Sequence, residues 1–558
     1  MGLIIGVGNT KPTFAYDYYY GIEWDATVSN PHPTRVGKME LHQSLPLQSL
    51  IRRCILKATH YTHLFNICTL LKHNYLLVYL KKKCYLCICT TEIFSGIGGD
   101  VRIGRRLSLL FNNMVETGSS VILRCNRTAA ERAGAYRAIH NRRYDMENLI
   151  EAVSADCVRR CTGVRHVLCI QDTTEYDYGH IRHRLSLGDP DFGPGSQEFL
   201  DFSIFAHPYM AVDAESLTPL GFLGMEVWSR PREACIRRAA VRDSLPLSQK
   251  ESCRWALAPS RASRLPGDVT ATIVSDREGD IAAALSAAVR GGCHFLVRSH
   301  YDRMTDGGVR LSTLMSSVPP CLTFELEIPA SHGRKRRTAR MELRFSKVRL
   351  LPPRKARKEE GDDIPLDACC VQATEIPGSA PPDCTPVEWR LLTSHDISTA
   401  EQALACIGWY KARWLIEELF RVTKTKGFNV EEAALEDGEA TKKLIVMTLC
   451  AALKTMALKN AYDRRDEEAE ADLLFTPAET GLLHALAGMV HSWSPRAAGG
   501  NCPFRDGTMA WAAWVVARIG GWLPNNKNKD RPGRIAINKG LNVFAHYVKF
   551  INFVNNTT

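Results

Sequence analysis

The sequence predicts an α/β protein whose sheet-containing core is flanked by helical regions on both sides in the chain. The pattern "DVTATIVSDREGDIAAALSAAVRGGCHFLVRS" alternates a strand, an acidic turn, an Ala-rich helix and a second strand. That order is typical of an α/β sheet with a crossover. Amphipathic segments precede this region, and a strongly apolar segment at 441–460 follows it.

The size and composition fit an ordinary globular protein with several domains. The chain has 558 residues, which predicts two to four domains, and 45% of its residues are hydrophobic and 23% charged. The 19 cysteines are scattered without a preceding secretory signal, so we expect a reducing cytoplasm and no disulfide framework. The longest apolar stretch, near residue 70, is broken by Lys72 and His73, so we expect no membrane insertion.

The first part of the chain divides into two regions that differ in composition and periodicity. Residues 1–93 are rich in Tyr, Cys, Leu and Ile without clear periodicity, and nothing in them indicates a function. Residues 94–163 are predicted to form a small helical unit. From 101 to 165 the chain holds twelve arginines, no lysine and six acids. Such an arginine excess favours phosphate contact, although a solvated helical surface would show it too.

The sheet region begins near residue 164. A short apolar run, Val167 to Ile170, is followed closely by Asp172, and further strand-like segments lead to the strand that precedes Asp276. We interpret residues 300–395 as a β-rich insertion, because strand-like pieces there alternate with basic runs and a Pro-rich loop. Residues 431–558 are predicted to be largely helical.

Asp172 and Asp276 each follow an apolar strand, at the edge where open α/β sheets place their sites. Either one alone could equally be a turn or cap residue. Asp280 is expected to cap the helix that begins near Ile281. As a pair followed by "TT" and "REGD", Asp172 and Asp276 suggest a common site.

The stretch "WYKARWLIEELFRVTKTK" at 409–426 is predicted to be one helix with four polar groups on one face. Its members are Tyr410, Arg413, Glu417 and Lys424. Glu418 should point about 100° away from that face. A surface salt bridge between Arg413 and Glu417 explains the spacing as well as a site does.

Two aspartates at a sheet edge and a glutamate on a helix form an oxygen-only ligand set suited to Mg²⁺. We therefore expect Asp172, Asp276 and Glu417 to hold two Mg²⁺ ions, with Mn²⁺ able to substitute. Such a pair of ions serves phosphodiester chemistry. Arg413 and Lys424 would then contact nucleic-acid phosphates.

Four segments together resemble the insertion-sequence-four family of bacterial DDE transposases. They are "IQDTTEYDYGH", "SDREGDI" with "FLVRS", "EWRLLTS", and "YKARWLIEELFRVTKTK". The family signature Tyr, two residues, Arg, three residues, Glu, six residues, Lys is matched at every step. The resemblance covers roughly residues 94 to 520. It fades at both edges, and residues 1–93 match nothing in the family.

The resemblance implies a ribonuclease-H-like catalytic domain at 164–430, with Asp172, Asp276 and Glu417 as its catalytic acids. It implies that Tyr410, Arg413 and Lys424 contact transposon-end DNA, and that Trp389 stacks on a base flipped from that end. Residues 94–163 would recognise the end, and residues 431–558 would support dimerisation and synapsis. Arg277 and Glu278 also match the family pattern, without an assigned role.

The expected function is therefore metal-dependent cut-and-paste DNA transposition by a homodimer acting on double-stranded DNA, both inverted-repeat ends and target. The expected location is the bacterial cytoplasm, in association with the nucleoid. A transposase-derived DNA-binding protein that has lost catalysis is the alternative, and a metal-dependent nuclease without strand transfer is a weaker one. The unmatched edges favour the first alternative, whereas the intact acids argue against it.

Overall fold

The structure analysed is a computed structural model, and it describes most of the chain beyond residue 91. Residues 83–558 form one compact unit. The predicted extension 1–93 falls almost entirely outside the described residues. The described ranges are 92–94, 96–185, 191–196, 202–231, 245–328, 337–352, 365–381, 384–424, 427–465, 467, 469–492, 502–524 and 531–557.

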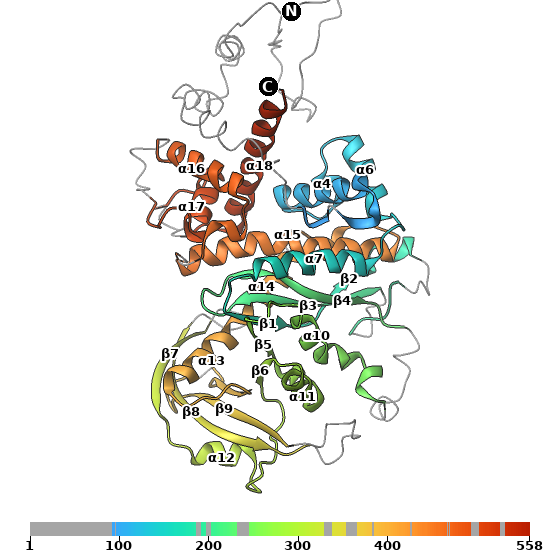
Figure 1. Ribbon diagram of the computed structural model, residues 1–558. Coiled ribbons are helices and arrows are strands. Elements are labelled where there is room, and N and C mark those ends of the chain that lie inside the picture. The colour runs from blue at the N-terminus through green and yellow to red at the C-terminus, as the bar shows by residue number, and fades with distance from the viewer. Residues whose placement is uncertain are drawn as a thin grey trace, which may run out of the picture. The chain divides into compact units, whose positions relative to one another are not determined.

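A single mixed sheet organises the described residues, with helices packed against it (Figure 1). It has ten strands in the order β2-β3-β1-β5-β6-β10-β9-β8-β7, and β4 pairs with β3. Their bounds are β1 His166–Gln171, β2 Thr174–Asp177, β3 Ser203–Asp213, β4 Pro219–Trp228, β5 Thr270–Ser275, β6 His294–Arg298, β7 Leu322–Ile328, β8 Arg337–Leu350, β9 Leu366–Glu375 and β10 Glu388–Thr393.

Strands β1, β5 and β6 run parallel to one another, and the other pairs are antiparallel. The predicted strands at 167–170 and 270–275 are therefore confirmed as neighbours in one sheet. The β-rich segment predicted at 300–395 does contain strands β7 to β10, but these strands extend the same sheet. They join it where β10 pairs with β6. The overall class, mixed α/β with many helices, agrees with the prediction.

The helices fall into groups before, within and after the sheet region. The α-helices are α4 Val101–Thr117, α5 Ile122–Cys125, α6 Ala129–Ile139, α7 Met146–Arg160, α10 Ala258–Ala262, α11 Ala282–Arg290, α12 Leu311–Ser317, α13 Ala400–Ala412, α14 Trp414–Lys424, α15 Gly438–Arg464, α16 Pro477–Ser492, α17 Met509–Ile519 and α18 Arg534–Thr557. The 3₁₀ turns are η2 Glu92–Phe94, η3 Ile97–Gly99, η4 Gly179–Arg184, η5 Leu247–Gln249, η6 Glu251–Ala256, η7 Arg277–Gly279, η8 Val430–Glu432 and η9 Ala471–Leu473.

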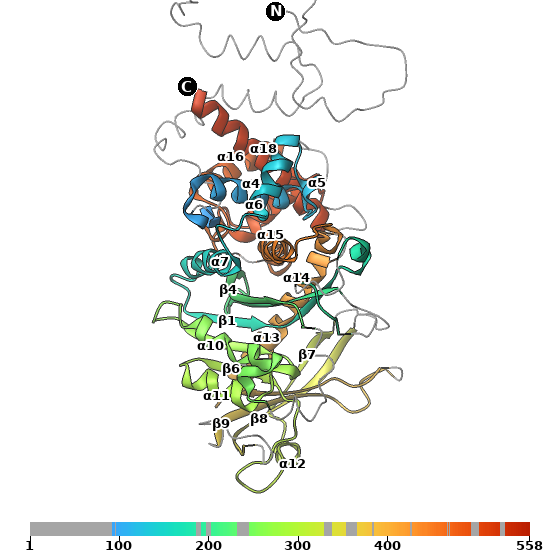
Figure 2. The same ribbon diagram turned by 90° about the vertical axis from the view of Figure 1, so that its right-hand side faces the viewer.

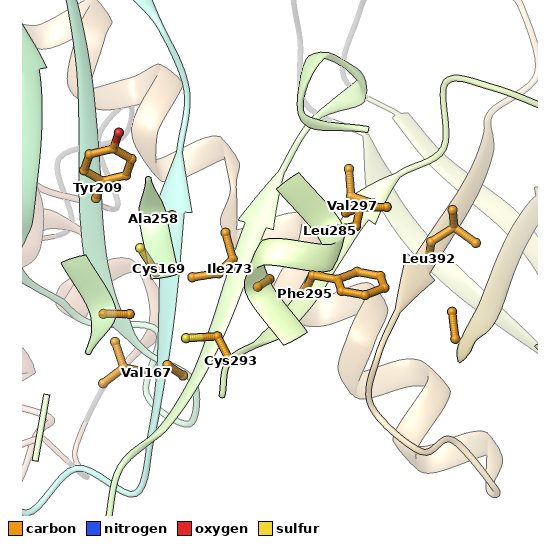
Figure 3. Packing of buried hydrophobic residues seen from close by; sticks show 14 of the residues in the cluster. Val167, Cys169, Tyr209, Ala258, Ile273, Leu285, Cys293, Phe295, Val297 and Leu392 are labelled. Atoms are coloured by element: carbon orange, nitrogen blue, oxygen red, sulfur yellow. The ribbon is translucent and has the colours of Figure 1, made fainter. Parts of the chain in front are cut away.

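Side chains from the central strands form one hydrophobic core with the helices beside them. Figure 3 shows Cys169 of β1, Ile273 of β5 and Phe295 of β6 in this cluster, near Leu285 of α11. Strand β1 is buried from its second residue onward. Strands covered on both faces need apolar side chains at nearly every position, which explains the unbroken run after His166. This packing holds the carboxyl ends of β1, β5 and β6 at fixed positions.

Helix α15 is the central element of the helical regions. It contacts α4, α7, α14, α17, α18 and strand β4. Figures 1 and 2 show it running between α7 and the sheet on one side and α4, α6, α17 and α18 on the other. It is the one helix among the described residues that is long and apolar enough to cross a membrane, and 83% of its apolar window is buried inside the protein. The 441–460 segment is therefore a core helix of this chain.

The N-terminal helices pack against the C-terminal ones through buried polar contacts. Lys443 of α15 is 1% exposed, and its ammonium donates to the carbonyl oxygens of Asn141 at 3.1 Å and Tyr144 at 2.9 Å. Its Nζ also lies 4.2 Å from the centre of the Tyr144 ring. Ser120 and Thr448 share a buried hydrogen bond of 2.8 Å. These contacts join the predicted 94–163 unit to α15.

Two local predictions were wrong. The stretch 409–426 is not one helix, because α13 ends at Ala412 and α14 begins at Trp414, with Arg413 between them. Asp280 does not cap the following helix. Its carboxylate is fully buried, pairs with Arg303, and accepts from the backbone N–H groups of His300 and Tyr301. A tertiary ion pair has replaced the local cap in this case.

Candidate active site

The two candidate aspartates lie side by side at one edge of the sheet. Strands β1 and β5 are parallel neighbours, and Ile170 is in register with Val274. Asp172 and Asp276 each stand two residues beyond this pair, so the register places them opposite each other. Neighbouring strands are about 4.8 Å apart, which puts both carboxylates within one small site. The sequence-based expectation of a shared sheet edge is met.

Asp172 is a half-buried carboxylate in an unfavourable electrostatic position. Its side chain is 18% exposed. Burial, with the nearby charge of Asp276 and a smaller contribution from Glu417, raises its pKa to about 7. The Arg413 guanidinium and the backbone N–H of Thr173, which donates to Oδ1 at 2.8 Å, oppose this rise. A carboxyl raised this far next to another acid indicates a site that lacks enough positive charge for its acids.

Arg413 joins the glutamate to the first aspartate. Its Nη1 donates to Asp172 Oδ2 at 3.1 Å, and its Nη2 donates to Glu417 Oε1 at 2.5 Å. The guanidinium side chain is only 9% exposed, whereas Glu417 is 36% exposed. Its position at the junction of α13 and α14 lets it reach both acids, which lie 241 and four residues away in sequence. The helix junction therefore brings Glu417 to the sheet edge.

The three acids supply suitable ligands for a divalent cation, but Arg413 pairs with two of them, Asp172 and Glu417, in this arrangement. Among the described residues, no three His, Cys, Asp or Glu side chains lie close enough together to hold a metal ion. The donor chemistry fits Mg²⁺, since Asp172, Asp276 and Glu417 offer only carboxylate oxygens. The raised pKa of Asp172 fits as well, because a bound cation would lower it. Movement of Arg413 away from the acids would free the oxygen atoms it now contacts.

Tyr410 and Trp389 form an aromatic pair beside the acids. Tyr410 of α13 is buried, and its ring centre lies 5.3 Å from that of Trp389 with the planes at 72°. The Arg413 guanidinium is 5.8 Å from the same tyrosine ring. Trp389, near the start of β10, is half-buried. Trp389, the predicted stacking residue, thus contacts Tyr410, which in turn lies beside Arg413 and the acids.

Lys424 lies at the far end of α14, in a separate polar environment. Its Nζ is 5.5 Å from the centre of the Tyr176 ring. Burial lowers the pKa of the Lys424 ammonium, and the charges of Glu431 and Glu175 partly offset this effect. Lys424 therefore lies on the same helix as Glu417, but it neighbours Tyr176, Glu431 and Glu175, whereas Glu417 pairs with Arg413.

Glu418 faces away from the acids, as its helical position predicts. Its carboxylate accepts from Arg421 Nε at 3.0 Å and lies 3.6 Å from Arg534 of α18. This ion-pair role leaves Glu417 as the glutamate on the site side of α14.

Arg298 is a further cation at this edge that the sequence interpretation did not single out. It ends β6, the third parallel strand, just as the two aspartates follow β1 and β5. Burial lowers its pKa, while Tyr410 raises it, and Arg277 and Arg413 are near enough to lower it further. The sequence signal that could have identified it is its position at the end of the apolar run in "FLVRS".

Arg254 is the second cation that sequence inspection missed. It belongs to the turn η6, its side chain is 12% exposed, and Nε donates to Thr173 Oγ1 at 2.9 Å. Nothing in the local sequence marks it, because its partner is 81 residues away. Arg254 thus lies beside Thr173, Arg298 near Tyr410, and Arg413 against two of the acids, and guanidinium groups can bind phosphate as well as carboxylate. No known protein-family model matches the chain.

Proposed function

We propose that this protein is a metal-dependent DNA transposase of the DDE type, related to the insertion-sequence-four family. The single observation that carries the proposal is that Asp172 and Asp276 share one sheet edge, with Glu417 near Asp172. The aspartates follow adjacent parallel strands in register, and Arg413 links Asp172 to Glu417. These acids match the family's catalytic positions, and the sheet edge is where α/β folds place active sites.

The architecture supports the finer parts of the proposal. A mixed sheet followed by a helix that carries the glutamate is consistent with a ribonuclease-H-like core at 164–430. Residues 94–163 would recognise the inverted-repeat end, with arginines such as Arg105 and Arg106 exposed on α4. Residues 431–558 would support a homodimer in the synaptic complex. The proposed partners are transposon-end and target DNA, and the proposed location is the bacterial cytoplasm, at the nucleoid.

The reaction we propose begins with hydrolysis of one strand at the transposon end, which frees a 3′-hydroxyl. That hydroxyl attacks the opposite strand to form a hairpin, a second hydrolysis reopens it, and the freed 3′-hydroxyl then joins target DNA. Each hydrolysis consumes one water molecule and leaves a 5′-phosphate and a 3′-hydroxyl. Each attack by a 3′-hydroxyl forms one phosphodiester bond as another breaks. The residues need only bind, align and polarise the reacting groups, without a covalent protein intermediate.

Asp172, Asp276 and Glu417 would hold the divalent ions. When bound, two such ions stabilise charge on the attacking and leaving oxygens of a phosphodiester. Arg413 would release the two carboxylates and bind a DNA phosphate, since a planar guanidinium can donate two parallel hydrogen bonds to either group. Among the described residues its Nε is buried without a hydrogen-bond partner, so the guanidinium has donor capacity left. Trp389 would stack on an unpaired base.

One observation favours a second candidate, a DNA-binding protein that no longer cleaves. Arg413 lies between Asp172 and Glu417 and contacts both, so these two carboxylates already have a cationic partner that a metal ion would have to displace. A protein locked in this arrangement would keep its basic surface and bind DNA with salt dependence, but would not cut.

The decisive experiment incubates purified protein with DNA from the flanks of its own reading frame, in Mg²⁺ or Mn²⁺. The proposal predicts nicking, hairpin formation and joining to a target plasmid, all lost in Asp172→Asn, Asp276→Asn and Glu417→Gln. Equal DNA binding by wild type and variants, with no cleavage by the wild type, would support the second candidate. Cleavage without joined products from a 3′-hydroxyl end would identify a nuclease.

A further inference from the structure

A directional chain of hydrogen bonds passes through both sequence neighbours of Asp172. Arg254 Nε donates to Thr173 Oγ1 at 2.9 Å, and this oxygen lies 2.9 Å from His207 Nδ1. His207 Nε2 lies 3.2 Å from Gln171 Oε1. Gln171 Nε2 then donates to the backbone oxygen of Trp255 at 3.4 Å, which returns the chain to the residue beside Arg254.

The donors and acceptors in this chain have a single consistent direction. A guanidinium only donates, so Thr173 Oγ1 accepts from Arg254 and its hydroxyl proton is free to go to His207 Nδ1. The ring proton of His207 is then on Nε2 and is donated to Gln171 Oε1. Each side chain in this series donates a hydrogen bond to the next, and the last one, Gln171, donates to the Trp255 carbonyl.

His207 is suited to this neutral, two-sided role. Its side chain is fully buried in β3, with ring centres of Trp255 at 4.8 Å and Tyr209 at 5.2 Å. Burial and the nearby charge of Arg254 hold the pKa of this imidazole well below its usual value. A histidine inside the otherwise apolar strand "SIFAHPYMAV" is unfavourable unless both ring nitrogens have partners, and here both do.

Arg254 fixes the chain to the turn that carries the second aspartate. Its guanidinium carbon lies 5.3 Å from the Trp228 ring centre, and Nη1 donates to the Glu251 carbonyl at 2.7 Å. Its Nη2 lies 3.9 Å from Glu278, two residues after Asp276. Through Thr173 on one side and Glu278 on the other, Arg254 spans the ends of β1 and β5.

We propose that His207, Thr173 and Arg254 are positioning residues that hold the backbone around Asp172, so that its carboxylate faces Asp276. The inference rests on the proposed function, because it assigns these residues to the geometry of the proposed metal ligands. They reach the ligand through the Thr173 backbone N–H, which donates to Asp172 Oδ1 at 2.8 Å. Loss of groups that orient a metal ligand typically weakens metal binding about 10- to 100-fold.

The test replaces Thr173 by Val, which keeps the shape and removes the hydroxyl that joins Arg254 to His207. Thr272→Val is the matched control. Thr272 is a buried β5 threonine whose Oγ1 lies 2.7 Å from both His166 Nε2 and His395 Nε2 near the opposite end of the strand. Mn²⁺ binding by the whole protein without DNA is measured by electron paramagnetic resonance at pH 8, together with thermal melting.

We expect Thr173→Val to weaken Mn²⁺ binding about tenfold or more, and Thr173→Ser to restore it. Thr272→Val should melt at a similar temperature to Thr173→Val but bind Mn²⁺ as the wild type does. Equal weakening by both valine variants, or by neither, overturns the inference. A purely structural role would lower the melting temperature without separating the two variants in metal affinity.

A second measurement, which needs no metal, decides the inference if the wild type binds no Mn²⁺ in the absence of DNA. The proposed function is tested separately, by the cleavage assay with DNA. Amide hydrogen exchange is followed by mass spectrometry in a peptide covering 170–176. Positioning predicts faster exchange there in Thr173→Val and in His207→Phe than in the wild type, and no change in Thr272→Val. Unchanged exchange in Thr173→Val and His207→Phe would show that the hydrogen-bond chain does not hold this segment.

Discussion

Replacing Asp172 by Asn should make the protein more stable at pH 8 while abolishing DNA cleavage. The side chain is 18% exposed, and its pKa rises from 3.8 to about 7 in the folded state. That rise corresponds to about 4 kcal/mol of penalty on the ionised form once the pH exceeds 7. Asparagine has nearly the same shape and carries no charge, so it avoids this penalty.

The sign of the pH dependence follows from proton binding. Between pH 3.8 and about 7 the folded carboxyl keeps a proton that the unfolded chain has released. The free energy of unfolding of the wild type therefore falls as the pH rises through this window. The Asn variant lacks this decline. The favourable contribution of Arg413 is already contained in the pKa of about 7 and does not reduce the difference further.

The net expectation is a variant about 4 kcal/mol more stable than the wild type at pH 8 and about 2 kcal/mol more stable at pH 5, where the wild type has lost only part of this free energy. One kcal/mol shifts the melting temperature by about 2–4 °C in chains of 150–250 residues, so a shift of a few degrees is expected for this longer chain. Thermal melting without divalent ions at several pH values measures it. Glu215→Gln, at a 62% exposed side chain that pairs with Arg165, is the control and should leave the melting temperature nearly unchanged.

The reasoning fails if Asp172→Asn melts below the wild type at pH 8, or if the difference between them is the same at pH 5 and pH 8. Saturating Mg²⁺ supplies a further check, because a ligand that binds only the folded state raises its stability. It should raise the melting temperature of the wild type and not that of the variant.

Three further predictions concern the neighbouring residues. Arg413→Gln removes the cation beside Asp172 and Glu417, so it should strengthen Mn²⁺ binding without DNA about tenfold while preventing cleavage, and weaker Mn²⁺ binding would contradict this. Trp389→Ala should reduce binding of an end that carries an unpaired base by about 1–3 kcal/mol, whereas fully paired DNA serves as the control and should bind unchanged. Lys443→Ala leaves the carbonyls of Asn141 and Tyr144 without their donor and should cost about 1–3 kcal/mol of stability, measured by thermal melting beside the exposed control Lys411→Ala.

The sequence predicted the strands that carry the two aspartates because buried parallel strands require unbroken apolar runs. It also predicted which glutamate of the pair at 417 and 418 faces the site, since helical spacing separates them by about 100°. These features depend on local periodicity, which a single sequence displays directly.

The features that were missed depend on residues far apart in the chain. The helix break at Arg413 has no Gly or Pro to mark it, and the guanidinium there pairs with Asp172, 241 residues away. Asp280 has the sequence position of a helix cap, but in the structure it forms a buried ion pair with Arg303. His207 and Arg254 gain their roles only through Thr173. In each case a tertiary contact decided the outcome over the local pattern.

The order in which the site's parts emerge from the ribosome has a consequence of its own. Both aspartates and the strands that carry them lie before residue 300, whereas Arg413 and Glu417 follow more than a hundred residues later. A nascent or prematurely terminated chain would have the aspartates without the glutamate. Under the proposed function, only a polypeptide synthesised past Glu417 could then cut DNA.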